Sequence, residues 1–278
     1  MIVTEKISEI RSVRWQDQIS TWGLVPTMGA LHAGHINILR RARRENDRIG
    51  VSIFINPIQF DNPADLATYP QSLEKDLEIL TEENVDLVWA PDANDIYHPG
   101  FQTYLDVEKL SKPFEGAARK GHFKGVTTIV AILFNVFQPQ RAYFGEKDAQ
   151  QLRIIRQMIN DLRFNLQIVA CPTVRERDGL AVSSRNRNLS SKGRKEAVCL
   201  FQALMIAKEA VKKGERTAVA LKKLMGDVIS SYSLARIDYI SIADSQTLNE
   251  INIIESQCLI LLAVFVENVR LIDNITIG

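Results

Sequence analysis

The chain has 278 residues, 46% of them hydrophobic and 24% charged, and its 34 lysines and arginines against 33 aspartates and glutamates leave a formal net charge of +1. Proteins that bind polynucleotides usually carry a basic excess, because neutralising phosphates drives that binding, so we expect no nucleic-acid partner. No apolar run approaches the roughly 18 residues of a membrane span, so we expect no membrane partner either.

The amino-terminal residues and the cysteines favour a cytoplasmic protein. Residues 1–16 alternate charged with isolated apolar residues and lack the basic-then-apolar order of a secretory signal. Cys171, Cys199 and Cys258 are odd in number, widely spaced and without a C-x-x-C pair. This spacing argues against a disulfide framework or a structural metal site, and we expect buried free thiols in a reducing compartment.

The first half of the chain alternates strand-like and helical patterns. We expect a strand over 22–26, a helix over 35–47, a strand over 49–56, a helix over 72–84 and a strand over 85–91. Repeated strand–helix–strand units predict parallel strands joined by right-handed crossovers.

The same alternation continues to residue 172. We expect a strand over 102–107, an apolar helix over 125–139 that ends at a proline, a strand, glycine turn and helix over 141–162, and a strand over 166–172. The fold class predicted for residues 1–172 is therefore α/β, a Rossmann-like doubly wound parallel sheet.

The pattern changes after residue 172. A serine-, arginine- and asparagine-rich stretch precedes helical patterns over 190–213 and 217–231 and apolar strand-like runs near the end of the chain. Residues 173–278 therefore predict a smaller α+β domain, which we expect to close over a site in the first domain.

The segment PTMGALHAGH, which follows the first predicted strand, contains two glycines and two histidines where a helix begins. Gly29 permits a tight turn, and Gly34 permits an anion to approach the N–H groups and the positive dipole end of the helix. His32 and His35 add side-chain donors three residues apart. The alternative is a turn that the glycines shape and the histidines cap.

Other polar segments also follow predicted strands, whose carboxyl ends form the ligand-binding edge of such sheets. Lys147 in FGEKD can reach a phosphate, or it can belong to a solvated charge cluster. Arg185 in VSSRN can fork onto phosphate oxygens, or it can belong to a polar linker. Asn56 and Gln59 in NPIQF suit a small organic acid or loop hydrogen bonds, and His122 in GHFKGV suits a lid, a turn or a solvated loop.

These motifs together resemble one family along almost the whole chain. The segments PTMGALHAGH, IFINPIQF, GHFKGVTTIV, FNVFQP, YFGEKDAQQL and RERDGLAVSSRN are similar to those of the pantoate–β-alanine ligases, or pantothenate synthetases, within the H-x-G-H nucleotidyltransferase superfamily. H-x-G-H alone is shared across that superfamily, whereas NPIQF together with FGEKDxQQL and DGLAxSSRN is specific to this family.

The resemblance implies a set of site residues. The ATP contacts that it implies are Met28, Gly29, Ala30, Leu31, His32, Ala33, Gly34, His35, Gly145, Glu146, Lys147, Asp148, Val174, Val182, Ser183, Ser184 and Arg185. Among these, His32, His35, Lys147 and Arg185 are the expected catalytic residues. Gln59 and Gln151 match residues that bind pantoate.

The activity implied by the resemblance is a two-step condensation of (R)-pantoate with β-alanine. The pantoate carboxylate attacks the α-phosphorus of ATP to give pantoyl adenylate and pyrophosphate, and the amine of β-alanine then displaces AMP. Mg²⁺ held mainly through the ATP phosphates and a homodimeric assembly are also implied. One departure is visible, because Val182 stands where the family commonly has methionine.

His35 matches the residue usually described as the proton donor, but a helix dipole opposes a positive charge at its start. We therefore expect His35 to be neutral at rest and to donate one N–H. Two alternatives stay open at this point: an adenylyltransferase with a phosphate-bearing acceptor, and a nucleotide-binding regulatory or RNA-associated protein on a synthetase-like fold.

Overall fold

The computed structural model describes the backbone of residues 1–278 and every side chain except that of Ala64. The chain divides into two compact units, the first comprising Met1–Glu146 with Gln150–Pro172 and the second comprising Lys147–Ala149 with Thr173–Gly278. The main division therefore follows Pro172. Residues 147–149 group with the second unit, although the sequence-based boundary at residue 172 places them in the first domain.

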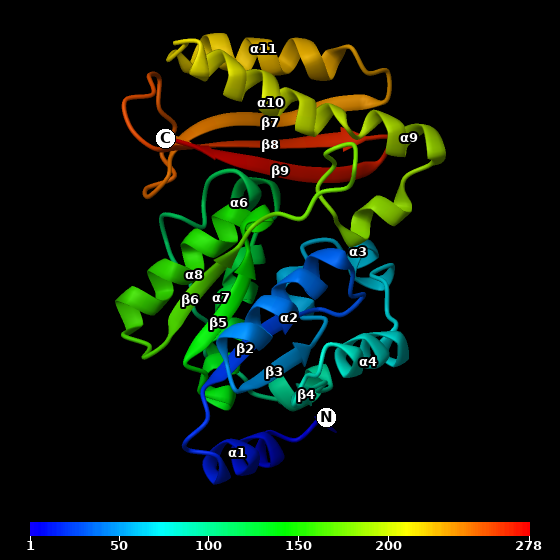
Figure 1. The fold of residues 1–278 in the computed structure, drawn as a ribbon, viewed down its shortest axis with the longest axis vertical. Helices are drawn as coiled ribbons and strands as arrows, with labels where there is room; N and C mark the ends of the chain where they lie inside the picture. The colour runs from blue at the N-terminus through cyan, green and yellow to red at the C-terminus, as the bar shows by residue number, and fades with distance from the viewer. The chain divides into compact units, whose positions relative to one another are not determined.

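A six-stranded parallel sheet forms the centre of the first unit, with strand order β1-β4-β3-β2-β5-β6 (Figure 1). The strands are β1 (Ile2–Thr4), β2 (Trp22–Thr27), β3 (Arg48–Ile53), β4 (Leu87–Trp89), β5 (Arg141–Gly145) and β6 (Gln167–Cys171). From β2, the strands β3 and β4 follow on one side, and β5 and β6 follow on the other side. The predicted doubly wound parallel sheet is therefore confirmed.

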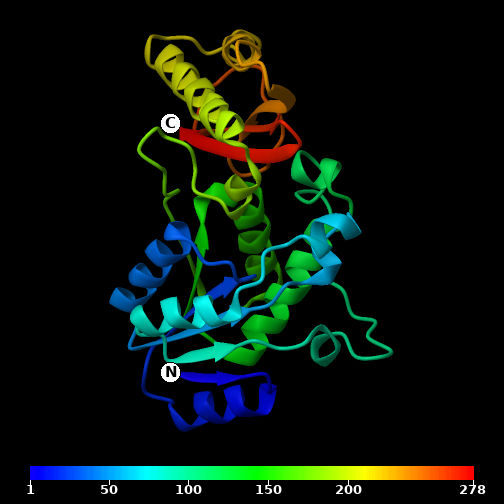
Figure 2. The same cartoon turned by 90° about the vertical axis from the view of Figure 1, so that its right-hand side faces the viewer.

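Helices cover both faces of this sheet. The helices of this part of the chain are α1 (Ile7–Gln16), α2 (Ala33–Glu45), α3 (Pro63–Ala67), α4 (Leu73–Glu82), α5 (Ala93–Ile96), α6 (Glu115–Ala118), α7 (His122–Phe137) and α8 (Ala149–Leu162). Apolar side chains of α2 and α4 pack with Val25, Val51 and Val88 on one face. Those of α1, α7 and α8 pack with Leu24 and Leu87 on the other, because successive strand residues point to opposite faces. Figure 2 shows this unit from the side.

One predicted strand is wrong. Residues 102–107 form no strand, because their backbone bonds to a helix rather than to a neighbouring strand. The Leu105 N–H donates to Thr128 Oγ1 at 3.0 Å, and the Leu105 carbonyl accepts from Thr127 Oγ1 at 2.6 Å. The sixth strand is instead β1, which pairs with β4 and which the charged amino terminus did not predict.

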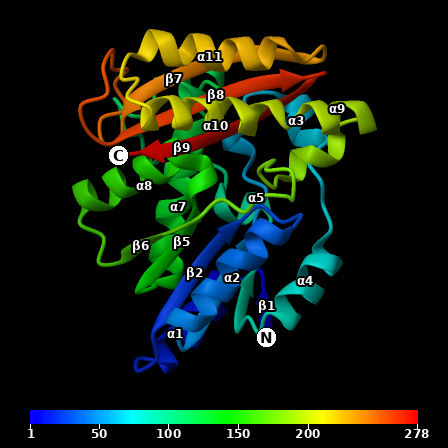
Figure 3. The ribbon, with the colours of Figure 1, turned by 45° about the horizontal axis from the view of Figure 1, so that its top comes forward.

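The second unit contains a three-stranded antiparallel sheet, ordered β7-β8-β9, with helices packed on it. Its elements are α9 (Ser191–Glu196), α10 (Cys199–Lys212), α11 (Ala218–Ser230), β7 (Ala235–Asp244), β8 (Cys258–Val266) and β9 (Val269–Ile277). Figure 3 shows α10 and α11 running along this sheet, and their apolar side chains share one core with it. In the described part of the chain, no helix combines the length and apolar character needed to cross a bilayer.

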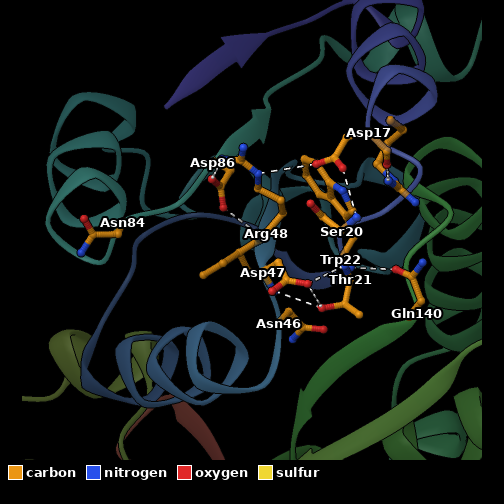
Figure 4. Close-up of polar contacts among 12 residues, drawn as sticks. Asp17, Ser20, Thr21, Trp22, Asn46, Asp47, Arg48, Asn84, Asp86 and Gln140 are labelled. Atoms are coloured by element: carbon orange, nitrogen blue, oxygen red, sulfur yellow. Dashed lines mark hydrogen bonds and ion pairs between the residues drawn. The ribbon is translucent and has the colours of Figure 1, made fainter.

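A polar network joins the amino ends of the strands in the first unit (Figure 4). Asp86 accepts hydrogen bonds from Arg43 Nη1 at 2.8 Å, from Arg48 Nη1 at 2.7 Å and from the Ile49 N–H at 2.8 Å. Gln140 Oε1 accepts from the Trp22 N–H at 2.7 Å. The network lies opposite the carboxyl-end edge, so we assign it to stability.

We expect Asp86→Ala to lower the free energy of unfolding by about 1–3 kcal/mol, because the partly buried Ile49 N–H loses its carboxylate acceptor. Glu82→Ala is the matched control, since that exposed side chain on α4 makes no hydrogen bond with any described residue. Urea denaturation measures both variants. Equal midpoints for the two would contradict the assignment.

Candidate functional site

The carboxyl ends of the parallel strands place the candidate residues of the first unit along one edge of the sheet. The segment from Met28 to His35 follows β2, the 3-10 helix η1 (Pro57–Gln59) follows β3, and Gly145 ends β5. The strands β2 and β5 are neighbours and form the point where the strand order changes direction. Open α/β sheets bind their ligands at such a point.

The loop between β2 and α2 has an unusual backbone that one carboxylate holds. Gly29 and Ala30 have positive φ angles of 80° and 51°. Asp76, which lies in the first turn of α4 and is 2% exposed, accepts from the Ala30 N–H and the Leu31 N–H, both at 2.8 Å. Thr27 Oγ1 accepts from the Gly29 N–H at 3.2 Å. The turn is thus determined by side chains from two other elements.

The side chains of His32 and His35 cap the start of α2 by accepting from backbone N–H groups. His32 Nδ1 accepts from the Gly34 N–H at 3.1 Å, and His35 Nδ1 accepts from the His32 N–H at 3.3 Å. The two half-buried rings are stacked, with centroids 4.1 Å apart and planes inclined by 29°. The capping alternative from the sequence is therefore real, and it occupies Nδ1 of each ring.

This geometry indicates which nitrogen of each imidazole carries hydrogen. A backbone N–H is always a donor, so each Nδ1 presents its lone pair, and the hydrogen of each neutral ring is on Nε2. Two stacked rings also disfavour a second positive charge so close to the first. We infer from these two hydrogen bonds that both imidazoles are neutral and carry their hydrogen on Nε2.

The internal hydrogen bonds change the expected role of the helix start. The N–H groups of Gly29, Ala30, Leu31, His32 and Gly34 all donate within the protein. The imidazole Nε2–H groups, rather than most of these amides, are then the donors suited to an anion. The glycine at position 34 also has a steric explanation besides the approach of an anion. An added Cβ would lie 2.9 Å from Cε1 of the His32 ring.

Gln59 lies in a buried amide cluster beside this loop. Its Nε2 contacts Met28 Sδ at 2.7 Å, and its Oε1 accepts from Asn56 Nδ2 at 3.3 Å. Asn56 Oδ1 accepts from the Tyr97 hydroxyl at 2.8 Å. Burial raises the pKa of Tyr97 well above its usual range, so the phenol remains a donor. The cluster fixes the Gln59 amide beside Met28.

His122 is part of this cluster and is not a solvated loop residue. It is 7% exposed, it begins α7, and its Nδ1 lies 2.7 Å from the Gln59 carbonyl oxygen. The preceding Gly121 has a φ of 80°, which is the turn that the sequence indicated. Gly125 on the same helix has no room for a Cβ, which would lie 2.6 Å from the Gln59 backbone nitrogen.

Two adjacent glutamines at the start of α8 differ sharply. Gln150 is 2% exposed, and its side chain bonds the Leu110 carbonyl at 2.9 Å, the Pro113 carbonyl at 2.8 Å and the Glu115 N–H at 3.1 Å. The half-buried Gln151 makes no side-chain hydrogen bond with any described residue. Gln150 is therefore a structural clamp, whereas the amide of Gln151 is uncommitted.

The candidate cations of the second unit share one hollow. The space over it, open solvent included, is about 250 Å³, and its lining residues are Lys147, Ala181, Ser183, Arg185, Asn186, Arg270, Leu271 and Ile272. Asn274 Nδ2 holds the Lys147 carbonyl at 2.8 Å, and Lys147 Nζ lies 3.9 Å from Asp148 Oδ1. Asn186 donates to the Ala181 carbonyl at 3.0 Å, while its buried Oδ1 has no partner among the described residues.

The loop that carries Ser183 and Arg185 has a defined base. The Val182 N–H donates to the Val174 carbonyl at 2.9 Å, and Arg175 forms a two-pronged ion pair with the buried Asp273 at 2.6 and 2.9 Å. Ser183 caps the amino end of the 3-10 helix η3 (Ser184–Asn188), and its Oγ accepts from the Arg185 N–H at 3.3 Å. These contacts bring the predicted residues from Val174 to Arg185 into one folded loop.

Comparison with known proteins decides the family. The sequence model of the family described as pantoate-beta-alanine ligase matches residues 2–276. The chain belongs to the pantoate–β-alanine ligase family. It is 50% identical over 274 residues to the pantothenate synthetase of Roseiflexus sp. (strain RS-1), covering 99% of this chain and 98% of the relative. The family expected from the sequence motifs is confirmed, and the protein is an enzyme of the ligase class.

Solved structures of family members have the same fold. The pantothenate synthetase of Thermus thermophilus matches with a TM-score of 0.94 and 41% identity over 99% of both chains. The pantoate–β-alanine ligase of Francisella tularensis, solved as a complex with beta-gamma ATP and beta-alanine, matches with a TM-score of 0.82 and 35% identity over 99% of this chain and 97% of that one.

Two side chains near the candidate site were not singled out from the sequence. Arg270 lines the hollow, and Asp76 binds the loop before α2. Arg270 on β9 lines the hollow, but nothing near it in the sequence distinguishes it from a surface arginine. Asp76 did carry a signal, because it lies three residues after Leu73 and four before Leu80, on the apolar face predicted for the helix over 72–84. An acidic residue on such a face needs a buried partner.

We expect Gly29→Ala to destabilise this ligase by more than the roughly 1–2 kcal/mol of a left-handed backbone, because the new Cβ would also lie 2.9 Å from Asp76 Oδ2. Gly100→Ala is the matched control, with a φ of 89° and no heavy atom within 4 Å of its Cβ. Thermal unfolding and turnover measure both variants. Equal losses of stability would show that the Asp76 contact does not constrain residue 29.

Proposed function

We propose that the protein condenses (R)-pantoate with β-alanine in two steps, with ATP as the activating substrate and pantoyl adenylate as the intermediate. The observation that carries the proposal is the pair of imidazoles at the start of α2, whose Nδ1 atoms both accept backbone hydrogen bonds. We infer that both rings are neutral, with hydrogen on Nε2. Membership of the pantoate–β-alanine ligase family supports the same reaction.

In the first step, a pantoate carboxylate oxygen bonds to the α-phosphorus of ATP, and the bond from that phosphorus to the bridging oxygen of pyrophosphate breaks. Negative charge grows on the phosphorus oxygens and on the leaving pyrophosphate. We propose that the Nε2–H groups of His32 and His35 donate to the α-phosphate oxygens as this charge develops. Donors already oriented toward growing charge are among the strongest contributors to enzymatic rate.

The proposed role of His35 is that of a hydrogen-bond donor rather than an acid. A neutral imidazole gives up its last N–H proton only with great difficulty, whereas an imidazolium transfers one readily. The capping of Nδ1 by the His32 N–H keeps His35 neutral. The attack of a carboxylate on phosphorus requires no proton transfer, so a neutral donor suffices.

We propose that Lys147, Ser183 and Arg185 stabilise the phosphates that leave as pyrophosphate. The support is that the three side chains line one hollow and that two of them are cations. The other nucleotide contacts implied by the family resemblance, including Val174 and Val182, stay predictions.

We propose that ATP arrives as its Mg²⁺ complex. Among the described side chains, no three His, Cys, Asp or Glu residues gather as metal ligands, so we assign the ligation of the ion to phosphate oxygens and water. The buried Oδ1 of Asn186 suits a hydrogen bond from such a water, because its amide nitrogen is already used by the Ala181 carbonyl. When bound, Mg²⁺ would neutralise charge on the triphosphate.

We also propose a cytoplasmic homodimer. The support for the dimer is the family resemblance, and gel filtration with light scattering tests it. The support for a reducing compartment is that Cys171, Cys199 and Cys258 are all free thiols buried in the protein. Burial raises the pKa of the Cys199 thiol to about 12, so this group stays protonated and unreactive.

The intermediate provides the test of function. Incubation of the enzyme with ATP, Mg²⁺ and pantoate but no amine is expected to yield a tightly held pantoyl adenylate, together with one pyrophosphate per active site. Addition of β-alanine then releases AMP and pantothenate in equal amounts. Rapid quench and mass spectrometry detect these species, and a reaction without pantoate is the control.

An adenylyltransferase would behave differently. It would retain AMP in its final product with a phosphate-bearing acceptor and would ignore β-alanine. Pyrophosphate release that requires such an acceptor, with no acyl adenylate in the quenched mixture, would reject the proposed reaction.

The two glutamines of α8 provide a matched pair for the acid substrate, which we propose Gln59 and Gln151 bind. Loss of a hydrogen bond to a carboxylate costs about 1.5–3 kcal/mol, so Gln151→Ala should raise the KM for pantoate by roughly tenfold to 100-fold. Its melting temperature should be unchanged, because the Gln151 amide makes no hydrogen bond with the described residues.

Gln150→Ala should do the reverse, because it removes three internal hydrogen bonds and no proposed substrate contact. We expect a lower melting temperature and an unchanged KM for pantoate. If Gln151→Ala instead altered only the KM for ATP, its assignment to pantoate would be wrong.

A further inference from the structure

We propose that Asp76 is a positioning residue for this reaction, which orients the loop before α2 and thereby holds His35 in its Nε2–H tautomer. The inference rests on the proposed role of His32 and His35. Asp76 lies on α4, 45 and 46 positions along the chain from the loop residues that it binds.

The first step of the argument is that Asp76 is itself fixed. It is 2% exposed, and its backbone N–H donates to the Ser72 carbonyl at 2.9 Å in the first turn of α4. The same helix anchors in the core through Leu80, which is fully buried. The carboxylate therefore cannot follow the loop if the loop moves.

The second step is that both carboxylate oxygens are directed at the loop. Oδ2 accepts from the Ala30 N–H and Oδ1 from the Leu31 N–H, both at 2.8 Å. Bonds to a charged acceptor are roughly twice as strong as neutral ones. They stabilise a backbone in which Ala30, a residue with a Cβ, has a φ of 51°. Two peptide units are thus held in a conformation that the sequence alone disfavours.

The third step links the loop to the imidazole. The peptide unit after Leu31 carries the His32 N–H, and that N–H donates to His35 Nδ1 at 3.3 Å. The orientation of Leu31 therefore determines where the His32 N–H points. If the loop relaxes, Nδ1 loses its donor, and the hydrogen can move to Nδ1 or a second proton can bind. Asp76 thus acts on the proposed donor through two residues of backbone.

The negative charge of Asp76 offers a competing explanation with the opposite sign. A buried carboxylate near an anion site repels the anion, so removal of its charge would tighten the binding of ATP. Positioning predicts instead that kcat falls, because the donors are aligned for the transition state. The effect on kcat and on the KM for ATP therefore separates the two explanations.

The test is Asp76→Asn, which keeps the shape but offers one acceptor oxygen where the loop needs two. We expect kcat to fall by up to about 10²-fold, with a smaller change in the KM for ATP. Imidazole ¹⁵N chemical shifts of the substrate-free protein should show that the Nε2–H tautomer of His35 is depleted. Glu74→Gln is the matched control, an exposed acidic residue in the same first turn of α4, and should behave as the wild type.

A His35 tautomer that is unchanged in Asp76→Asn would overturn the proposal, as would a lower KM for ATP with kcat retained. If Asp76→Asn yields no folded protein, Asp76→Glu keeps the charge but moves the oxygens by one methylene. The same tautomer change is expected there, and its absence also overturns the proposal. The tautomer is measured without substrates, so this outcome is independent of whether the enzyme forms pantoyl adenylate, which tests the proposed function instead.

Discussion

The structure around the start of α2 depends on one requirement, which is that buried backbone N–H groups need acceptors. Where β2 turns into α2, these acceptors are the Asp76 carboxylate, the Thr27 hydroxyl and the Nδ1 atoms of His32 and His35. Because each imidazole uses Nδ1 for this purpose, its hydrogen must be on Nε2. Local backbone chemistry thus prepares the side chains that we propose for catalysis.

Elsewhere in the chain, too, some polar side chains hold the structure while nearby ones are proposed to bind ligands. Gln150 uses its whole amide to hold the segment from Leu110 to Glu115, while its neighbour Gln151 keeps its amide uncommitted toward the described residues. In the second unit, Arg175 is bound to Asp273 at the base of the loop that carries Arg185. Gln150 adjoins Gln151 in the sequence, and Arg175 lies on the same loop as Arg185, so spacing alone does not separate the two roles.

Prediction from the sequence succeeded where the pattern was long and periodic. The apolar runs of β2, β3 and β5 and the amphipathic pattern of α4 identified a parallel doubly wound sheet, and the motifs identified the ligase family. It failed at residues 102–107, where threonine hydroxyls of α7 replace a neighbouring strand, and at β1, whose pairing with β4 leaves no local pattern. In both cases the sequence does not show what an extended segment will hydrogen-bond to. That partner lies elsewhere in the chain, so the segment's own residues do not specify it.

The sequence by itself determined the parallel doubly wound class of the first unit, the family and the residue types at the candidate site, because hydrophobic period and motif spacing are local properties. Only the tertiary structure decided which nitrogen of each histidine accepts a backbone hydrogen bond, why Gly29 and Gly34 have no side chain, and that Asp76 holds the loop. It also decided that Lys147 shares a hollow with Ser183 and Arg185. These features depend on atoms far apart in the chain, whose distances arise only when the chain is folded.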